Sequence, residues 1–176
     1  MYKRQNSKRL FFETNLKKSI KDSDAIFIAV GTPSRKVDGH ADLSFVFNAA
    51  EEIAKFINGY TLIVTKSTVP VGTGSKVKQL IEKANYKAEF DIASNPEFLR
   101  EGSAIEDFMR PDRVVVGVET ERAKKMMATL YRPLFLLETP VVYTSLESAE
   151  LIKYASNAFL AVKISVSYTH LTLPTN

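Results

Sequence analysis

Two glutamates four residues apart, Glu97 and Glu101, have the type and spacing that most clearly suggest chemistry. They follow a short apolar run, and Asn95 and Pro96 fit the N-cap and first position of a helix. A strand that leads into a helix is therefore predicted, with both carboxylates on one helical face, where like charges cost roughly a few tenths of a kcal/mol. The pair could be a solvated first turn, which suits the positive end of the helix dipole. It could instead be a ligand site, because open α/β sheets bind ligands at the carboxyl ends of their strands.

A second set of polar groups lies near the C-terminus. Glu150, Lys153 and Asn157 are spaced by three and four residues, so they share one face of a predicted helix over 146–165. A solvated face is the usual explanation of such a stripe. Here the stripe is narrow and the rest of the helix is apolar, which favours a ligand-facing role. Nearby carboxylates would also help to keep an amine protonated.

Two loops offer backbone and hydroxyl groups. The first is Val30-Gly31-Thr32-Pro33-Ser34, in which the glycine lets a ligand approach the backbone, although an ordinary turn would read the same way. The second runs from Lys66 to Gly74, and its hydroxyls, lysine and glycines could meet a phosphate or ribose. It is not a Walker loop, because the lysine precedes the glycines.

The elements that would position these groups alternate along the chain. The predicted strands, most of them apolar on both faces, cover residues 9–13, 24–30, 61–65, 90–93, 113–118 and 141–143. The predicted helices, of which the second has Asp42 as its N-cap, cover residues 16–20, 43–57, 75–84, 121–130 and 146–165. Strands that alternate with helices predict an α/β protein with a doubly wound parallel sheet.

Composition excludes several classes of function. The formal charge of +4 comes from 24 basic and 20 acidic residues that are scattered, so we expect no nucleic-acid partner. No apolar run approaches the about 20 residues that cross a bilayer, so we expect no membrane partner and a cytoplasmic location. The 176 residues include no cysteine and two histidines, so we expect neither a disulfide framework nor a metal site.

Both ends of the chain resemble read-through from a transposon-type sequencing adapter. Residues 1–5 match the translation of such an adapter, and residues 166–169 match the translation of its inverted copy. We therefore divide the chain into adapter residues 1–5 and 166–176, a partial nucleotide-binding domain over 6–144, and the start of a long central helix over 145–165.

Five runs, in this order, resemble the UDP-glucose/GDP-mannose dehydrogenase family. They are Phe27 to Pro33, Lys66 to Gly72, Asn95 to Gly102, Pro111 to Arg113, and Lys153 to Asn157. The resemblance covers essentially all of residues 9–165. It implies an NAD-dependent enzyme that oxidises the C6 alcohol of a nucleotide sugar to a carboxylate in two hydride transfers. It also implies a Rossmann-like sheet that here lacks its first βα unit.

The resemblance assigns roles to individual residues. The residues implied to contact NAD are Val30, Gly31, Thr32, Pro33, Ser34, Ser67, Thr68, Val69 and, near the nicotinamide ribose, Glu101. The residues implied to hold the nucleotide sugar are Glu97, Phe98, Leu99, Arg100, Glu101, Lys153 and Asn157. For catalysis, Thr68 would order a water, and Lys153 and Asn157 would stabilise negative charge on the C6 oxygen. Glu97 would be the general base that hydrolyses a thioester intermediate.

The chain departs from the family pattern in three parts. The Gly-rich fingerprint, the nucleophilic cysteine and the second, sugar-nucleotide domain have no counterpart in this sequence. We therefore expect the isolated chain to be inactive. The resemblance also implies that the long final helix leads toward a dimer-forming segment, so we expect the parent to be a homodimer or larger. The run Phe98-Leu99-Arg100 resembles members that act on UDP-glucose and GDP-mannose more than members that act on N-acetylated mannosamine. We favour UDP-glucose as the substrate, with GDP-mannose as the alternative within the family. The alternative from another class is a non-catalytic nucleotide-binding module.

Overall fold

The computed structural model describes residues 9–135 and 139–170. The elements in chain order are α2 (Leu16–Ile20), β1 (Ala25–Ile28), α3 (Ser44–Ala54), β2 (Tyr60–Thr65), α4 (Thr73–Ala84), β3 (Glu89–Ser94), α5 (Ala104–Met109), β4 (Val114–Val118), α6 (Glu121–Phe135), β5 (Val141–Thr144) and α7 (Leu146–His170).

The five strands form one sheet in the order β1-β2-β3-β4-β5. The β1–β2, β2–β3 and β4–β5 pairs are parallel, as predicted, whereas β3 and β4 are antiparallel. The connection over residues 95–113 holds only the six-residue α5 and does not return to the starting edge of the sheet. Consequently β4 starts beyond the end of β3 and pairs with it only at Ala93 and Ser94. The sheet is mostly, not wholly, parallel.

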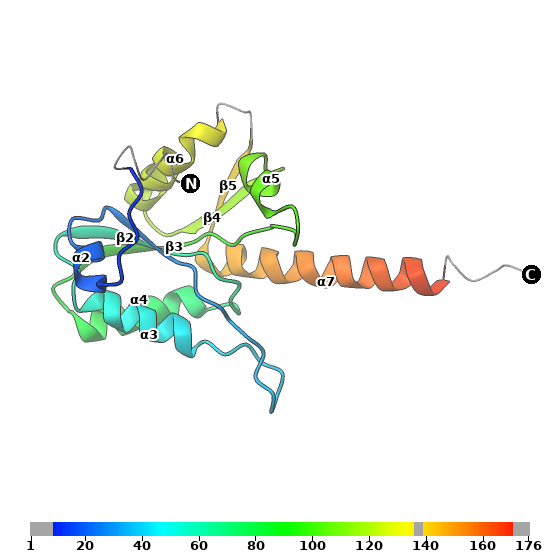
Figure 1. Cartoon of the computed structure of the whole chain (residues 1–176), viewed down its shortest axis with the longest axis horizontal. Coiled ribbons are helices and arrows are strands. Elements are labelled where there is room, and N and C mark those ends of the chain that lie inside the picture. The colour runs from blue at the N-terminus through cyan, green and yellow to red at the C-terminus, as the bar shows by residue number, and fades with distance from the viewer. Residues whose placement is uncertain (1–8, 136–138, 171–176) are drawn as a thin grey trace, which may run out of the picture.

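Helices cover both faces of the sheet, and this confirms the α/β, doubly wound architecture. Successive residues of β2 point to opposite faces: Ile63 packs in one cluster with α3 and α4, and Leu62 and Val64 pack in the other with α6. All three side chains are fully buried. Figure 1 shows α3 and α4 below the sheet and α6 above it. An apolar run with no alternation is what a strand buried on both faces requires.

Two local predictions were wrong. Residues 9–13 form no strand, and Phe11 and Phe12 are 74% and 67% exposed, because this segment pairs with no strand in the described part of the chain. Helix α3 has Leu43, not Asp42, at its cap position. The Asp42 carboxylate still accepts the Ser44 N–H at 2.9 Å, so it satisfies a first-turn donor from one residue further back.

Helix α7 begins beside the ends of β3 and β4 and then extends away from the body (Figure 1). Its buried residues lie in the first turns: Leu146, Ala149, Glu150 and Lys153. The helix continues past residue 165, where we had placed the start of the adapter, to His170 without interruption. Across the described residues, no helix combines the length and apolar character needed to span a membrane.

Candidate functional site

The loops that follow β1 and β2 are tied together at one edge of the sheet. The Lys66 and Ser67 N–H groups donate to the Ile28 carbonyl at 2.9 and 3.3 Å. The Ser67 hydroxyl donates to the Val30 carbonyl at 2.6 Å, and the Thr32 hydroxyl donates to the Thr68 carbonyl at 2.9 Å. The structure therefore brings Val30–Ser34 next to Ser67–Val69.

The side chains of these loops differ in how available they are. Gly31, Pro33 and Ser34 are exposed, whereas Val69 is buried in the α3–α4 core and offers only its backbone. At Gly31 a Cβ would meet no atom within 4 Å, and its φ lies outside the left-handed region. Neither packing nor backbone conformation requires glycine there, and the lack of a side chain leaves the backbone open to close approach.

The segment after β3 is a tight loop rather than the predicted helix. The Glu97 carboxylate accepts the Leu99 N–H at 2.6 Å, and Asp107 accepts the Arg100 N–H at 2.8 Å. Such side-chain hydrogen bonds compete with the backbone hydrogen bonds of a helix. Gly102, at φ +86°, also has a non-helical backbone conformation just before α5 begins. Glu97 and Glu101 are therefore not one helical turn apart on a common face.

Asn95 is a buried bridge and not an N-cap. It is 1% exposed, and its amide nitrogen donates to the Val115 carbonyl at 2.8 Å. Its Oδ1 accepts hydrogen bonds from the Lys66 amine, at 3.2 Å, and from the Tyr131 hydroxyl. One amide thus joins the ends of β2 and β3 to β4 and α6.

Glu97 and Lys153 meet as an ion pair. The Lys153 Nζ lies 3.3 Å from the Glu97 Oε1, and the two side chains are 7% and 31% exposed. The same amine lies 5.3 Å from the centre of the Phe98 ring, and the Arg113 guanidinium lies 5.2 Å from it. The loop after β3 and the first turns of α7 therefore converge, as the positions of these residues in the sequence predicted.

Lys66 and Tyr131 belong to this neighbourhood. The sequence singled out Lys66 only as a contact for a phosphate or ribose, and it did not single out Tyr131. Burial lowers the pKa of the Lys66 amine to about 8, an effect that Glu97 opposes and Lys153 reinforces. Burial raises the pKa of the Tyr131 hydroxyl to about 12, against the effect of its hydrogen bond to Asn95. A lysine directly after a buried strand was an available signal for Lys66. The tyrosine sits in an ordinary amphipathic helix and carried none.

Other predicted residues lie at the margin. Asn157 and Glu101 are exposed, and the Arg100 guanidinium pairs with Asp107 at 2.7 Å. Leu99 is half-buried in the wall of a cavity of about 520 Å³, bounded by Lys66, residues 95–100, residues 106–108 and 110–114, and the end of α6. Among the described residues, no cluster of histidine, aspartate or glutamate side chains is arranged to hold a metal ion.

Loops at the carboxyl ends of neighbouring parallel strands are where open α/β sheets, including those of dinucleotide-binding dehydrogenases, bind their ligands. Residues 1–135 match the UDP-glucose/GDP-mannose dehydrogenase family, NAD binding domain. The chain belongs to this family of oxidoreductases, and the match confirms both the resemblance carried by the five sequence runs and NAD as the cofactor.

Relatives and solved structures agree with this assignment. The chain is 57% identical over 161 residues to a UDP-glucose 6-dehydrogenase of Rhizobium meliloti, which covers 90% of this chain and 37% of that protein. It is 51% identical over 158 residues to UDP-glucose 6-dehydrogenase TuaD of Bacillus subtilis, with 89% and 33% covered. The chain thus spans about a third of these relatives.

Two solved structures have nearly the same fold. A UDP-glucose dehydrogenase from Pyrobaculum islandicum has a TM-score of 0.88 at 42% identity and covers 94% of this chain and 38% of its own. A GDP-mannose dehydrogenase from Pseudomonas aeruginosa has a TM-score of 0.89 at 34% identity, with 95% and 39% covered.

Proposed function

We propose that this chain is part of an NAD-dependent dehydrogenase that oxidises the C6 alcohol of UDP-glucose to the carboxylate of UDP-glucuronate in two hydride transfers. The observation that carries the proposal is the Glu97–Lys153 pair, whose charges both act on Lys66 at the start of the loop after β2 of an NAD-binding domain. The high identity to two UDP-glucose 6-dehydrogenases favours UDP-glucose as the substrate. We propose that the parent protein is a homodimer or larger, assembled in part through its long helix.

The residues of the two tied loops fit NAD. The backbone of Val30–Ser34 and the Ser67–Val69 segment would line its site, and the open position at Gly31 leaves room for close contact. NAD supplies the hydride acceptor when bound. Thr68 belongs to this loop pair, and its hydroxyl would hold a water beside the reacting carbon. Glu101, exposed on the turn before α5, would approach the cofactor ribose.

The polar groups of Lys153, Asn157 and Glu97 would stabilise negative charge on the sugar and accept a proton during its oxidation. Lys153 is 5% exposed as a residue, so its positive charge acts in a poorly solvated place, where electrostatic stabilisation of a C6 oxyanion is strong. Asn157, one turn further along α7, would add an amide donor. Glu97 would accept a proton from the water that hydrolyses the thioester formed in the second oxidation. The loop Glu97–Glu101 would hold the sugar nucleotide through its backbone.

Activity can be tested in a protein that supplies the rest of the enzyme. Residues 9–165 of this chain, inserted in place of the matching segment of the Rhizobium meliloti relative, give a protein that we call the graft. We expect the graft to form two NADH per UDP-glucose consumed. A folded graft that reduces NAD with GDP-mannose and not with UDP-glucose would move the proposal to that substrate. A folded graft that binds either nucleotide sugar without reducing NAD would favour a non-catalytic binding module.

A further inference from the structure

The N-terminus of α4 is capped from a distant part of the chain. Its N-cap residue is Gly72, in the left-handed region at φ +89°, and no cap side chain bonds to the first turn. The first N–H groups of a helix lack helical partners and are ordinarily satisfied by a local Ser, Thr, Asp or Asn. Here the Glu150 carboxylate of α7 accepts the Gly72 N–H at 2.6 Å and the Gly74 N–H at 2.7 Å.

This carboxylate sits in a closely fitted and nearly dry place. Glu150 is 2% exposed. Its Oε1, which accepts the Gly74 N–H, also accepts a hydrogen bond from the Ser94 hydroxyl at 3.4 Å. A Cβ on Gly74 would lie 3.2 Å from the Glu150 Oε1 and 3.2 Å from the Ser94 Oγ. Glycine at 74 therefore leaves the space that the carboxylate occupies. Burial raises the pKa of Glu150, while the Gly74 and Gly72 N–H groups favour its charged form.

One turn of α7 consequently touches two of the loops that form the site. Glu150 holds the end of the loop that carries Ser67 and Thr68, and Lys153, three residues later, pairs with Glu97 of the loop after β3. We infer that Glu150 is a positioning residue that fixes the 66–72 loop against Lys153. This inference rests on the proposed function, because it assigns the two loops to cofactor and sugar.

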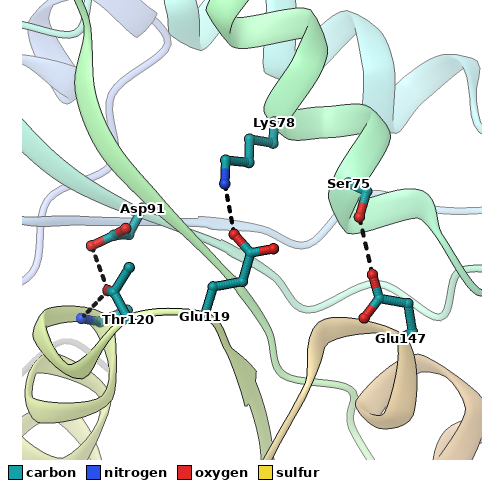
Figure 2. A network of polar contacts seen from close by, with 7 residues as sticks. Ser75, Lys78, Asp91, Glu119, Thr120 and Glu147 are labelled. Atoms are coloured by element: carbon teal, nitrogen blue, oxygen red, sulfur yellow. Dashed lines mark hydrogen bonds and ion pairs between the residues drawn. The ribbon is translucent and has the colours of Figure 1, made fainter.

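A neighbouring glutamate provides a matched control. Glu147 lies one turn earlier on α7 and also contacts α4. Its carboxylate accepts a hydrogen bond from the Ser75 hydroxyl at 3.1 Å, at the exposed surface (Figure 2). Glu147→Gln changes the same charge on the same helix and leaves the backbone N–H groups of Gly72 and Gly74 capped.

The first test is amide hydrogen exchange on the 176-residue chain, which needs no activity. Glu150→Gln keeps the size of the side chain but replaces one acceptor oxygen with a donor, so at least one of the two glycine N–H groups loses its partner. We expect at least tenfold faster exchange at Gly72 and Gly74, with unchanged exchange in β2 and in Glu147→Gln. Equal exchange in both variants at these glycines would overturn the inference, and so would a uniform increase throughout the sheet.

The second test uses the graft and adds a variant that changes the α4 partner of Glu150, Gly74. Gly74→Ala improves intrinsic helix propensity, so a purely local role of this turn predicts neutral or better behaviour. We expect both Gly74→Ala and Glu150→Gln to lower kcat about tenfold and raise the KM for NAD, with the KM for UDP-glucose within twofold. Kinetics equal to those of Glu147→Gln would overturn the inference. An inactive parent graft would instead count against the proposed function and leave the exchange result to decide on Glu150.

Discussion

At the scale of single residues, the Lys66 amine has the most unusual surroundings. It is partly buried, bonded to Asn95, and near both members of the Glu97–Lys153 pair. Its pKa of about 8 lies below the value of about 10.4 of an unfolded lysine, so between these pH values the unfolded chain binds more protons. The free energy of unfolding must therefore rise with pH across this window.

We predict that wild type gains on the order of 1–2 kcal/mol of unfolding free energy relative to Lys66→Met between pH 7 and pH 9.5. Urea denaturation of both proteins at the two pH values measures the difference. Lys78→Met is the control, because the ion pair with Glu119 at 2.7 Å raises the pKa of Lys78 (Figure 2). A lysine whose pKa is raised by folding contributes a constant free energy of unfolding below the pKa of the unfolded lysine, about 10.4. The difference between wild type and Lys78→Met therefore stays flat up to pH 9.5. A flat difference for Lys66 too would refute the account of its environment.

At the scale of elements, the packing of α7 on β4 depends on a missing side chain. A Cβ on Gly117 would lie 2.6 Å from the Ser145 carbonyl oxygen, 2.8 Å from the Leu146 Cα and 2.9 Å from the Ala149 Cβ. These atoms belong to the start of the helix that carries Lys153, so any displacement there moves the amine relative to Glu97.

We predict that Gly117→Ala lowers the free energy of unfolding by about 3 kcal/mol, because backbone must move to admit the methyl group. Thermal and urea denaturation measure the loss. Gly31→Ala serves as the comparison, since its Cβ would meet no atom within 4 Å, and its stability should stay within about 0.5 kcal/mol of wild type. Equal stability of the two variants would contradict the packing described here. In the graft, Gly31→Ala should weaken NAD binding.

Sequence pattern predicted the elements well where periodicity was strong. The strand bounds at β2 and β5 and the helix starts at α6 and α7 differ by at most one residue from those expected. The antiparallel β3–β4 pair was missed, because strand direction depends on whether a connection crosses the sheet, and apolar runs do not encode that. The helix predicted after Asn95 failed for another reason: an asparagine suits an N-cap and a buried bridge equally well.

The candidate site was predictable in part. Glu97 and Lys153 converge because strand ends and the following helix meet at one edge of the sheet. The contacts of Tyr131 and Glu150 join residues far apart in the sequence, and local spacing holds no information on such contacts. Glu150 shared a helical face with Lys153, as expected, but it binds the backbone of α4 instead of facing a ligand site.

At the scale of the whole molecule, the chain spans only part of the length of its relatives. It spans 37% of its Rhizobium meliloti relative and contains no cysteine, so it holds no thiol for the covalent second oxidation of the proposed function. We predict that the purified 176-residue protein forms no NADH from NAD and UDP-glucose above the rate without protein. The graft under the same conditions is the positive control. NADH formation in proportion to the concentration of the chain would show that the described residues suffice.

The central claim is that Lys153, held by Glu97 and supported through Glu150, stabilises the reacting oxygen of the sugar. Steady-state turnover of the graft with Lys153→Ala tests it most directly. The account predicts a fall in kcat of about a hundredfold or more, the range found when one oxyanion donor is removed, with the KM for NAD little changed. A graft that folds normally and keeps its full kcat after this substitution would contradict the account.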